Sequence, residues 1–518
     1  MKRKAILRAA ALTVLAAAAA GPAFGQTTFS KYVALGDSIT ASFQGLCLVT
    51  RNQNASYPLL VSQQLGITDF QQPLFAEGPL SADPNINKCV GFVVSGNAIT
   101  VGAVSDQLQP TNLTLPRPYD NLGIVGATAA ELITITKADP TGNTANKFAF
   151  AILRNNGPSG NPLNGTNAIQ QAASLAPNLV TLWIGSDDVL GALLYAIALD
   201  GVTMTPVASF TQSYTQIIQT IQSTGATIVT LNIPSVDAVP FANTIPPVVL
   251  DPSTNEPIIV GGAPVPLLGP GDAAFPCPDG QTACPLPPGT LVTLAANSPQ
   301  AALGGKSLLQ VGFGIPCAVA PLPQCNKPLP DGQFNPPSTI IPGVLLYPDE
   351  VDRIRARTDE LNAVIANVGG AAGAIPIDIH TIFNGIAAHG YEIGGLTLTT
   401  KFATGGIFSA DGFHPNCIAQ AIVADAVINA LNAAKHLSIP QPNMASALFT
   451  PNVPPGAASA TAPGLDFSDQ MRRQLYAAFP PVTAGIQVLE PEAPISRVDP
   501  RARPEKNRTV ERPGERKN

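Results

Sequence analysis

Three residue types that can act together in nucleophilic catalysis occur in two distant parts of the chain. Ser38 lies in the string GDSIT, directly after an apolar run at residues 32–35. A serine hydroxyl is a weak nucleophile unless a neighbouring base takes its proton. The chain has only four histidines, and one of them, His414, follows Asp411 by three residues in DGFHP. A carboxylate at this spacing can hold the imidazole and stabilise its protonated form. The pattern therefore indicates nucleophilic catalysis by a hydroxyl, an imidazole and a carboxylate.

This chemistry is favoured when Ser38 lies at the carboxyl end of a strand. A serine that follows a strand and opens a helix projects its hydroxyl into the crevice at the strand ends, where helix N–H groups favour a developing oxyanion. After the first apolar run, β-like runs alternate with helical patterns: strands are expected at 121–125, 179–184, 226–233 and 374–379, and helices at 209–222, 348–368 and 417–434. This alternation predicts a parallel sheet covered on both faces, with ligands bound beyond the carboxyl ends of the strands.

The first 25 residues have the features of a removable secretory signal peptide. The sequence MKRKAILR is basic, residues 9–20 are mostly apolar, and AFG places small residues before a cleavage site at Gln26. A membrane anchor would need about 20 apolar residues, which is longer than this run. No later stretch is apolar for long enough to span a bilayer. We expect a protein that is secreted, either to a periplasm or outside the cell.

The composition argues against several classes of function. Charged residues make up 12% of the 518 residues, and the net charge is −6. The chain therefore has neither the charge content of a coiled coil nor the basic surface that binding to nucleic acid requires. No glycine-rich loop fits a nucleotide phosphate, and no cluster of histidines and carboxylates has metal-ligand spacing. We expect no cofactor, no metal and no nucleic-acid partner.

Seven cysteines in an exported chain indicate structural disulfides. Close spacing pairs Cys277 with Cys284 and Cys317 with Cys325, a third bridge is expected between Cys47 and Cys89, and Cys417 then remains as a buried thiol. Metal binding is the competing interpretation. It is disfavoured because the sequence has no CxxC and no histidine close to the paired thiols.

Two segments depart from the alternation of strands and helices. Of the 52 prolines, 22 fall between residues 240 and 342, together with four cysteines. Because proline lacks a backbone donor, we expect a loop-rich insertion there, or alternatively a small separate domain. Residues 485–518 mix charges of both signs with prolines and few apolar residues, which predicts a disordered tail. The remaining chain divides into the signal peptide (1–25), a core domain (26–436) and a C-terminal extension (437–484).

Four sequence blocks, in order, resemble those of the SGNH/GDSL hydrolases. GDSIT is similar to the first block, and DGFHP to the last. YDNLGIVGATAAEL at residues 119–132 and LWIGSDDVLG at residues 182–191 are similar to the second and third blocks. The resemblance covers roughly residues 31–436. It implies an α/β fold, a three-layer α/β/α sandwich with a parallel sheet (the flavodoxin-like SGNH fold), and the activity of a secreted GDSL-like lipase or esterase.

The resemblance also implies a role for each matching residue. Ser38 would be the nucleophile, His414 the general base and then acid, and Asp411 the residue that orients His414. The oxyanion would be bound by the backbone N–H groups of Ser38 and Gly126, and by a side chain at the position of Asp187.

At this last position the chain departs from the family pattern. The family has asparagine in a G-x-N-D block, where this sequence reads GSDD at residues 185–188. An ionised carboxylate only accepts hydrogen bonds, whereas a protonated one can donate. Three outcomes follow. Burial and the neighbouring Asp188 keep Asp187 neutral, or Ser186 donates instead, or the site is weak or inactive.

The expected function is hydrolysis of carboxylic esters through an acyl-enzyme on Ser38. Small-molecule, lipid and carbohydrate esters all fit this expectation as substrates. The alternative comes from another class of protein: a secreted, non-catalytic binding protein that keeps the SGNH fold while Asp187 impairs the oxyanion hole.

Overall fold

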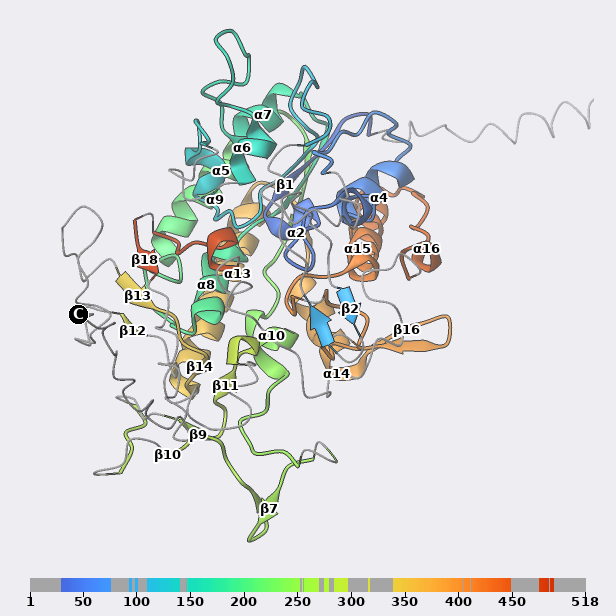
Figure 1. Ribbon diagram of the computed structural model, residues 1–518. Helices are drawn as coiled ribbons and strands as arrows, with labels where there is room; N and C mark the ends of the chain where they lie inside the picture. The colour runs from blue at the N-terminus through green and yellow to red at the C-terminus, as the bar shows by residue number, and fades with distance from the viewer. Residues whose placement is uncertain are drawn as a thin grey trace, which may run out of the picture.

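The computed structural model describes most of the chain between residues 29 and 488 (Figure 1). The described residues are 29–75, 93–95, 98–100, 110–139, 146, 148–251, 254, 256–269, 274–278, 284–296, 315–316, 339–402, 404–409, 411–448, 475–483 and 485–488. The expected signal peptide and three of the cysteines expected in disulfides, Cys89, Cys317 and Cys325, lie outside these residues.

A five-stranded parallel sheet, in the order β15-β6-β5-β1-β4, forms the centre of the molecule. Its strands are β1 (Tyr32–Gly36), β4 (Asn121–Gly123), β5 (Leu179–Trp183), β6 (Thr227–Leu231) and β15 (Ile375–Ile377). Each lies where the sequence predicts a strand, with ends that differ by at most about two residues, the usual uncertainty of such boundaries. Numbered along the chain, the strand order is 2-1-3-4-5, as in flavodoxin-like folds. The expected three-layer α/β/α sandwich is therefore confirmed.

Alternate residues of the strands supply two hydrophobic cores, one on each face of the sheet. Val33 and Leu35 of β1 belong to the larger core, whereas Tyr32 and Ala34 belong to the core on the opposite face. This division follows from the pleat of a strand, because successive side chains point to opposite faces. All residues of β1 and β5 are buried. Both faces of the sheet must therefore be covered.

Helices cover the two faces (Figure 1). Helices α9 (Val207–Gln222) and α13 (Pro348–Ala371) pack on each other and on the larger core, which also contains residues of α7 (Ala168–Ser174) and α8 (Asp187–Tyr195). Helices α4 (Tyr57–Gln64) and α15 (Cys417–Lys435) pack together over the opposite face. Among the described residues, α15 is long and apolar enough to cross a membrane, but most of it is packed inside the protein.

The other elements are short and lie mainly in the connections. The helices are α2 (Ser38–Ala41), α3 (Thr50–Gln53), α5 (Glu131–Thr134), α6 (Phe148–Leu153), α10 (Pro240–Asn243), α14 (Ile379–His389) and α16 (Met444–Leu448), with 3-10 turns at Val236–Ala238 and Leu294–Ala296. The strands are β2 (Val93–Ser95), β3 (Ala98–Thr100), β7 (Ile259–Val260), β8 (Ala263–Pro264), β9 (Leu268–Gly269), β10 (Cys284–Pro285), β11 (Leu291–Val292), β12 (Ile315–Pro316), β13 (Thr339–Ile341), β14 (Leu345–Leu346), β16 (Tyr391–Ile393), β17 (Leu396–Leu398) and β18 (Gln487–Val488).

The described part of the proline-rich stretch has little regular structure. Its strands β7 to β12 have two residues each, as expected where proline removes backbone donors. A disulfide joins Cys277 to Cys284, as the sequence predicts. Cys417 is buried, and its thiol lies 3.8 Å from the side-chain oxygen of Gln44. The boundaries expected for this insertion and for the C-terminal extension stay predictions.

Residues 475–483, here called the C-terminal segment, return from the far end of the chain to the centre of the fold. The carbonyl oxygen of Phe479 accepts a hydrogen bond of 2.6 Å from the Tyr195 hydroxyl, and the ring of Tyr476 stacks on that of Tyr195. The N–H of Val482 donates to the carbonyl of Val202. Beyond the segment, β18 pairs with β13, so residues 487–488, which the sequence assigned to the tail, form a strand.

Candidate active site

Ser38 lies at the carboxyl end of β1, where a tight turn connects the strand to α2. Gly36 ends β1, and a Cβ there would overlap the carbonyl oxygen of Trp183 and the side chain of Thr40. Glycine is therefore required for β1 to approach β5 closely at this point. Asp37 then caps α2, because its Oδ1 accepts the N–H of Ile39 at 2.9 Å. These two features fix the position of Ser38, which is buried with 3% of its surface exposed.

Ser38, His414 and Asp411 form one line of hydrogen bonds. The Oγ of Ser38 is 2.9 Å from Nε2 of His414, and Nδ1 of His414 is 2.8 Å from Oδ2 of Asp411. When Nδ1 donates its proton to the carboxylate, Nε2 is left to accept the proton of the Ser38 hydroxyl. The structure thus brings together residues 376 positions apart in the sequence, in the arrangement that activates a hydroxyl as a nucleophile.

Asp411 is held by donors that the sequence motif does not reveal. Its Oδ1 accepts the Ser409 hydroxyl at 2.8 Å and the N–H groups of Phe413 and His414. Its Oδ2 also accepts the N–H of Leu46 at 3.2 Å. Burial alone would raise the pKa of Asp411, but the charge of His414 and these hydrogen bonds outweigh it and hold the pKa below its usual value. Asp411 is therefore ionised, as a residue that orients an imidazole must be.

Aromatic rings surround the imidazole of His414. Phe413 lies against it with ring centroids 4.3 Å apart, and Phe43 meets it edge-on at 5.2 Å. The third ring belongs to Phe479 of the C-terminal segment, at 5.6 Å. His414 is 1% exposed as a result. The C-terminal segment is therefore part of the wall that separates the imidazole from water.

Gly126 follows β4 and also meets the C-terminal segment. Its φ of +74° lies in the left-handed region, which favours glycine. A Cβ at this position would overlap the carbonyl oxygen of Ala478. Strand β4 neighbours β1 in the sheet, so Gly126 lies next to the strand end that carries Ser38, as the sequence predicts.

Asp187 opens α8 at the end of β5, the neighbour of β1 on its other side. It is 7% exposed, and its Oδ2 is buried without a hydrogen-bond partner among the described residues. The next residue, Asp188, is tied into the fold, because its Oδ2 accepts the N–H of Ala129 at 2.9 Å. Buried polar atoms without partners are rare in folded proteins and often lie at sites of function.

The buried carboxyl groups beside Ser38 have raised pKa values. Burial raises the pKa of Asp187 well above its usual value, and the nearby charges of Asp37, Asp188 and Glu131 act in the same direction. Burial also raises the pKa of Asp188 to about 7 and that of Asp37 to about 6, although N–H donors act in the opposite direction. Several carboxylates cannot all ionise in one dry region. We therefore expect Asp187 to keep its proton to a higher pH than an ordinary aspartate.

The sequence alone does not identify all the residues that build this site. Ser409, Phe43 and Phe479 contact Asp411 or His414 but belong to no motif. Ser409 could have been noticed, because it precedes Asp411 by two residues and a serine there can bond a neighbouring carboxylate. Phe479 could not, because nothing in its local sequence indicates contact with a histidine 65 positions earlier. In the described part of the chain, no group of three or more histidine, cysteine or acidic residues is arranged to hold a metal ion.

Comparison with protein families gives an independent result. Residues 32–259 match the model of the family described as GDSL-like Lipase/Acylhydrolase. This range contains Ser38, Gly126 and Asp187 and ends before Asp411 and His414. No curated protein and no solved structure matches the chain. The family match, the flavodoxin-like sheet and Ser38 at the end of its first strand agree with one another, and residues 32–259 are therefore similar to the SGNH/GDSL hydrolases, a family of lipase- and esterase-type acyl hydrolases.

Proposed function

We propose that the protein is a secreted serine hydrolase that cleaves carboxylic esters through an acyl-enzyme on Ser38. One observation carries the proposal: hydrogen bonds of 2.9 and 2.8 Å join the Ser38 hydroxyl, the His414 ring and the Asp411 carboxylate in series. This arrangement activates a hydroxyl for attack on an acyl carbonyl. The match of residues 32–259 to a family of acyl hydrolases supports the same chemistry.

The reaction has two halves. In acylation, Oγ of Ser38 bonds to the carbonyl carbon while its proton passes to Nε2 of His414, and Asp411 stabilises the imidazolium. The tetrahedral intermediate then collapses, the bond to the alcohol oxygen breaks, and the alcohol leaves with the proton from Nε2. In deacylation, water gives a proton to Nε2 and bonds to the acyl carbon. The bond between the acyl carbon and Oγ of Ser38 then breaks, Nε2 returns the proton to Oγ, and the acid leaves.

The oxyanion would be bound by the N–H groups of Ser38 and Gly126 and by a protonated Asp187. The raised pKa of Asp187 supports this role, because a neutral carboxyl group can donate a hydrogen bond where a carboxylate would repel the oxyanion. The unpartnered Oδ2 is the atom that would carry the donated proton. Of the three outcomes that the sequence allows, we propose the first.

Nitrophenyl esters of increasing acyl length, assayed at several pH values, test the activity. We expect hydrolysis by the wild type and none above background by Ser38→Ala. A serine-reactive organophosphonate should label the wild type once per chain and leave Ser38→Ala unlabelled. Hydrolysis that survives in Ser38→Ala would contradict the proposal.

The second candidate is a non-catalytic binding protein on the same fold. The observation in its favour is the acidic residue at the family's asparagine position, because an ionised Asp187 would oppose the charge of the intermediate. The two candidates differ in the labelling experiment. Folded wild-type protein that neither hydrolyses esters nor reacts with the organophosphonate would favour the binding protein.

Secretion is part of the same proposal and has a separate test. It is supported by the basic start, the apolar run at residues 9–20 and the small residues before Gln26. The full chain, expressed with its own leader, should be recovered outside the cytoplasm with Gln26 as its first residue. N-terminal sequencing of the exported protein measures this, and a mature protein that retains Met1 would refute it.

A further inference from the structure

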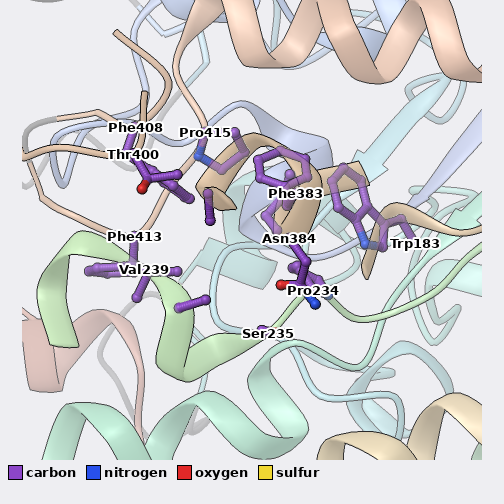
Figure 2. A pocket seen from close by; sticks show the side chains of 13 residues that line it. Trp183, Pro234, Ser235, Val239, Phe383, Asn384, Thr400, Phe408, Phe413 and Pro415 are labelled. Atoms are coloured by element: carbon purple, nitrogen blue, oxygen red, sulfur yellow. The ribbon is translucent and has the colours of Figure 1, made fainter. Parts of the chain in front are cut away.

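A small apolar cavity lies beside the Ser38–His414 pair. Figure 2 shows Trp183, at the end of β5, close to Phe383 of α14, with Phe413 across the cavity from Trp183. None of the lining residues is charged. The polar members are Ser235, Asn384 and Thr400. The cavity is therefore suited to an uncharged, mainly hydrocarbon group.

The lining residues tie this cavity to the catalytic pair. Ile39, which follows Ser38 directly, contributes one wall. Phe413 and Pro415, the two neighbours of His414 in the chain, contribute others, and the ring of Phe413 lies 4.3 Å from that of His414. These neighbours make the cavity the candidate site for a group bonded to the carbonyl carbon that Ser38 attacks.

The free space in the cavity is small. It amounts to about 30 Å³. Only a small group of non-hydrogen atoms fits such a space without moving the walls. A longer group would have to displace buried side chains such as Trp183 and Phe383, which are 0% and 7% exposed, and overpacking of closely packed side chains is unfavourable.

We propose that this cavity receives a short apolar group attached to the ester carbonyl and thereby limits the substrate to short esters. The inference rests on the proposed function and names its substrate class: esters in which one side of the carbonyl carries only a few carbon atoms. The short group is either the acyl chain or the alcohol. Both have the same chemistry, and the experiment below separates them.

Two substrate series measure the length limit. One series varies the acyl chain, with nitrophenyl acetate, butyrate and octanoate. The other varies the alcohol, with ethyl, butyl and octyl acetate followed by acid release. We expect kcat/KM to fall about tenfold or more between the short and the octyl member of one series, as when a small pocket disfavours extra methylene groups. The series in which it falls identifies the group that enters the cavity.

Substitutions in α14 test whether the cavity causes the length limit on the substrate. Ala387 lines it and is exposed, so Ala387→Phe should narrow it without unfolding the protein. We expect this variant to reduce kcat/KM for butyl-length groups at least about fivefold more than for acetyl. Phe383→Ala should enlarge the cavity and raise the octyl-to-acetyl ratio about tenfold. The matched control is Ala208→Phe, an exposed alanine on α9, which should leave both ratios unchanged.

The outcomes separate this inference from the proposed function. If the organophosphonate labels Ser38 in every variant, but Ala387→Phe and Phe383→Ala have wild-type length profiles, the cavity does not hold the substrate and the inference is overturned. A wild type that hydrolyses octyl members of both series as fast as short ones overturns it as well. If wild-type Ser38 is neither labelled nor needed for hydrolysis, the proposed function itself fails. Melting temperatures of the variants identify any that have lost their fold.

Discussion

The backbone carbonyl of Ala478 occupies the place where a side chain on Gly126 would begin. Gly126 follows the second strand of the sheet in chain order, and Ala478 lies more than 350 positions later in the C-terminal segment. The C-terminal segment therefore packs directly against Gly126, the proposed oxyanion donor. A change at either residue should therefore disturb the other.

Replacement of Gly126 tests this contact. Gly126→Ala must adopt a φ of +74°, which costs about 1–2 kcal/mol for an alanine, and must also displace Ala478. Gly165→Ala is the matched control, because its φ of +75° is the same but nothing lies within 4 Å. We expect both variants to lower the melting temperature and only Gly126→Ala to reduce kcat/KM, by about tenfold or more. Equal loss of activity in the two variants would contradict the contact.

Removal of the C-terminal segment should expose the active site. A chain ending at residue 474 loses the ring of Phe479, which lies against His414, whereas a chain ending at residue 488 keeps it. Because Ser38 is only 3% exposed, we expect the shorter chain to react with the organophosphonate several-fold faster than the longer one. Labelling reactions that are quenched at a series of times and analysed by mass spectrometry give both rates. Identical rates would show that the segment does not restrict access to Ser38.

Asp187, the acidic residue of the proposed oxyanion site, should make the enzyme more active at acid pH than at alkaline pH. Asp187 donates only while protonated, so activity should fall as the pH rises through its raised pKa. Asp187→Asn cannot ionise, and it should flatten this alkaline fall in kcat/KM. Asp187→Ala should lose about 10²–10³ in kcat relative to the wild type at pH values below the pKa of Asp187, and less above it. An Asp187→Asn profile identical to that of the wild type would exclude Asp187 as the donor, and a large loss in Ser186→Ala would assign the role to Ser186 instead.

Asp188 should make the folded protein more stable in mild acid. Its pKa is raised by burial to about 7 in the folded state, from an ordinary value of 3.8. Between these two values the folded protein binds more protons than the unfolded chain, so stability falls as the pH rises through this window. We expect the melting temperature to drop by at least a few degrees from pH 5 to pH 8, and by less in Asp188→Asn. A melting temperature that rises over this range in the wild type would contradict the raised pKa.

Local patterns were sufficient to predict the sheet and to single out Ser38, Asp411 and His414, which the structure joins by hydrogen bonds. The apolar runs of β1, β5 and β6 are short, continuous and bounded by polar residues, as fully buried parallel strands must be, and they therefore reveal their own positions. GDSIT and DGFHP each place a reactive group directly after or before a regular element. The topology of a parallel sheet then brings the two groups to the same edge.

Contacts between distant, irregular segments were beyond the reach of these patterns. Phe479 packs against His414 from a stretch with no strong periodicity. The pairing of β18 with β13 depends on a few apolar side chains that composition assigned to a tail. The raised pKa of Asp187 likewise depends on its own burial and on the nearby charges of Asp37 and Asp188, which are properties of the packed site.

The place of the C-terminal segment has a consequence for biosynthesis. A ribosome makes the chain from residue 1 onward, and domains fold as their residues emerge. Ser38 is made early, whereas the imidazole that would activate it and the aromatic ring that lies over that imidazole come from residues 414 and 479 of 518. A growing polypeptide therefore carries Ser38 without its imidazole partner until residue 414 has been made, and without the ring of Phe479 until 65 further residues have been added.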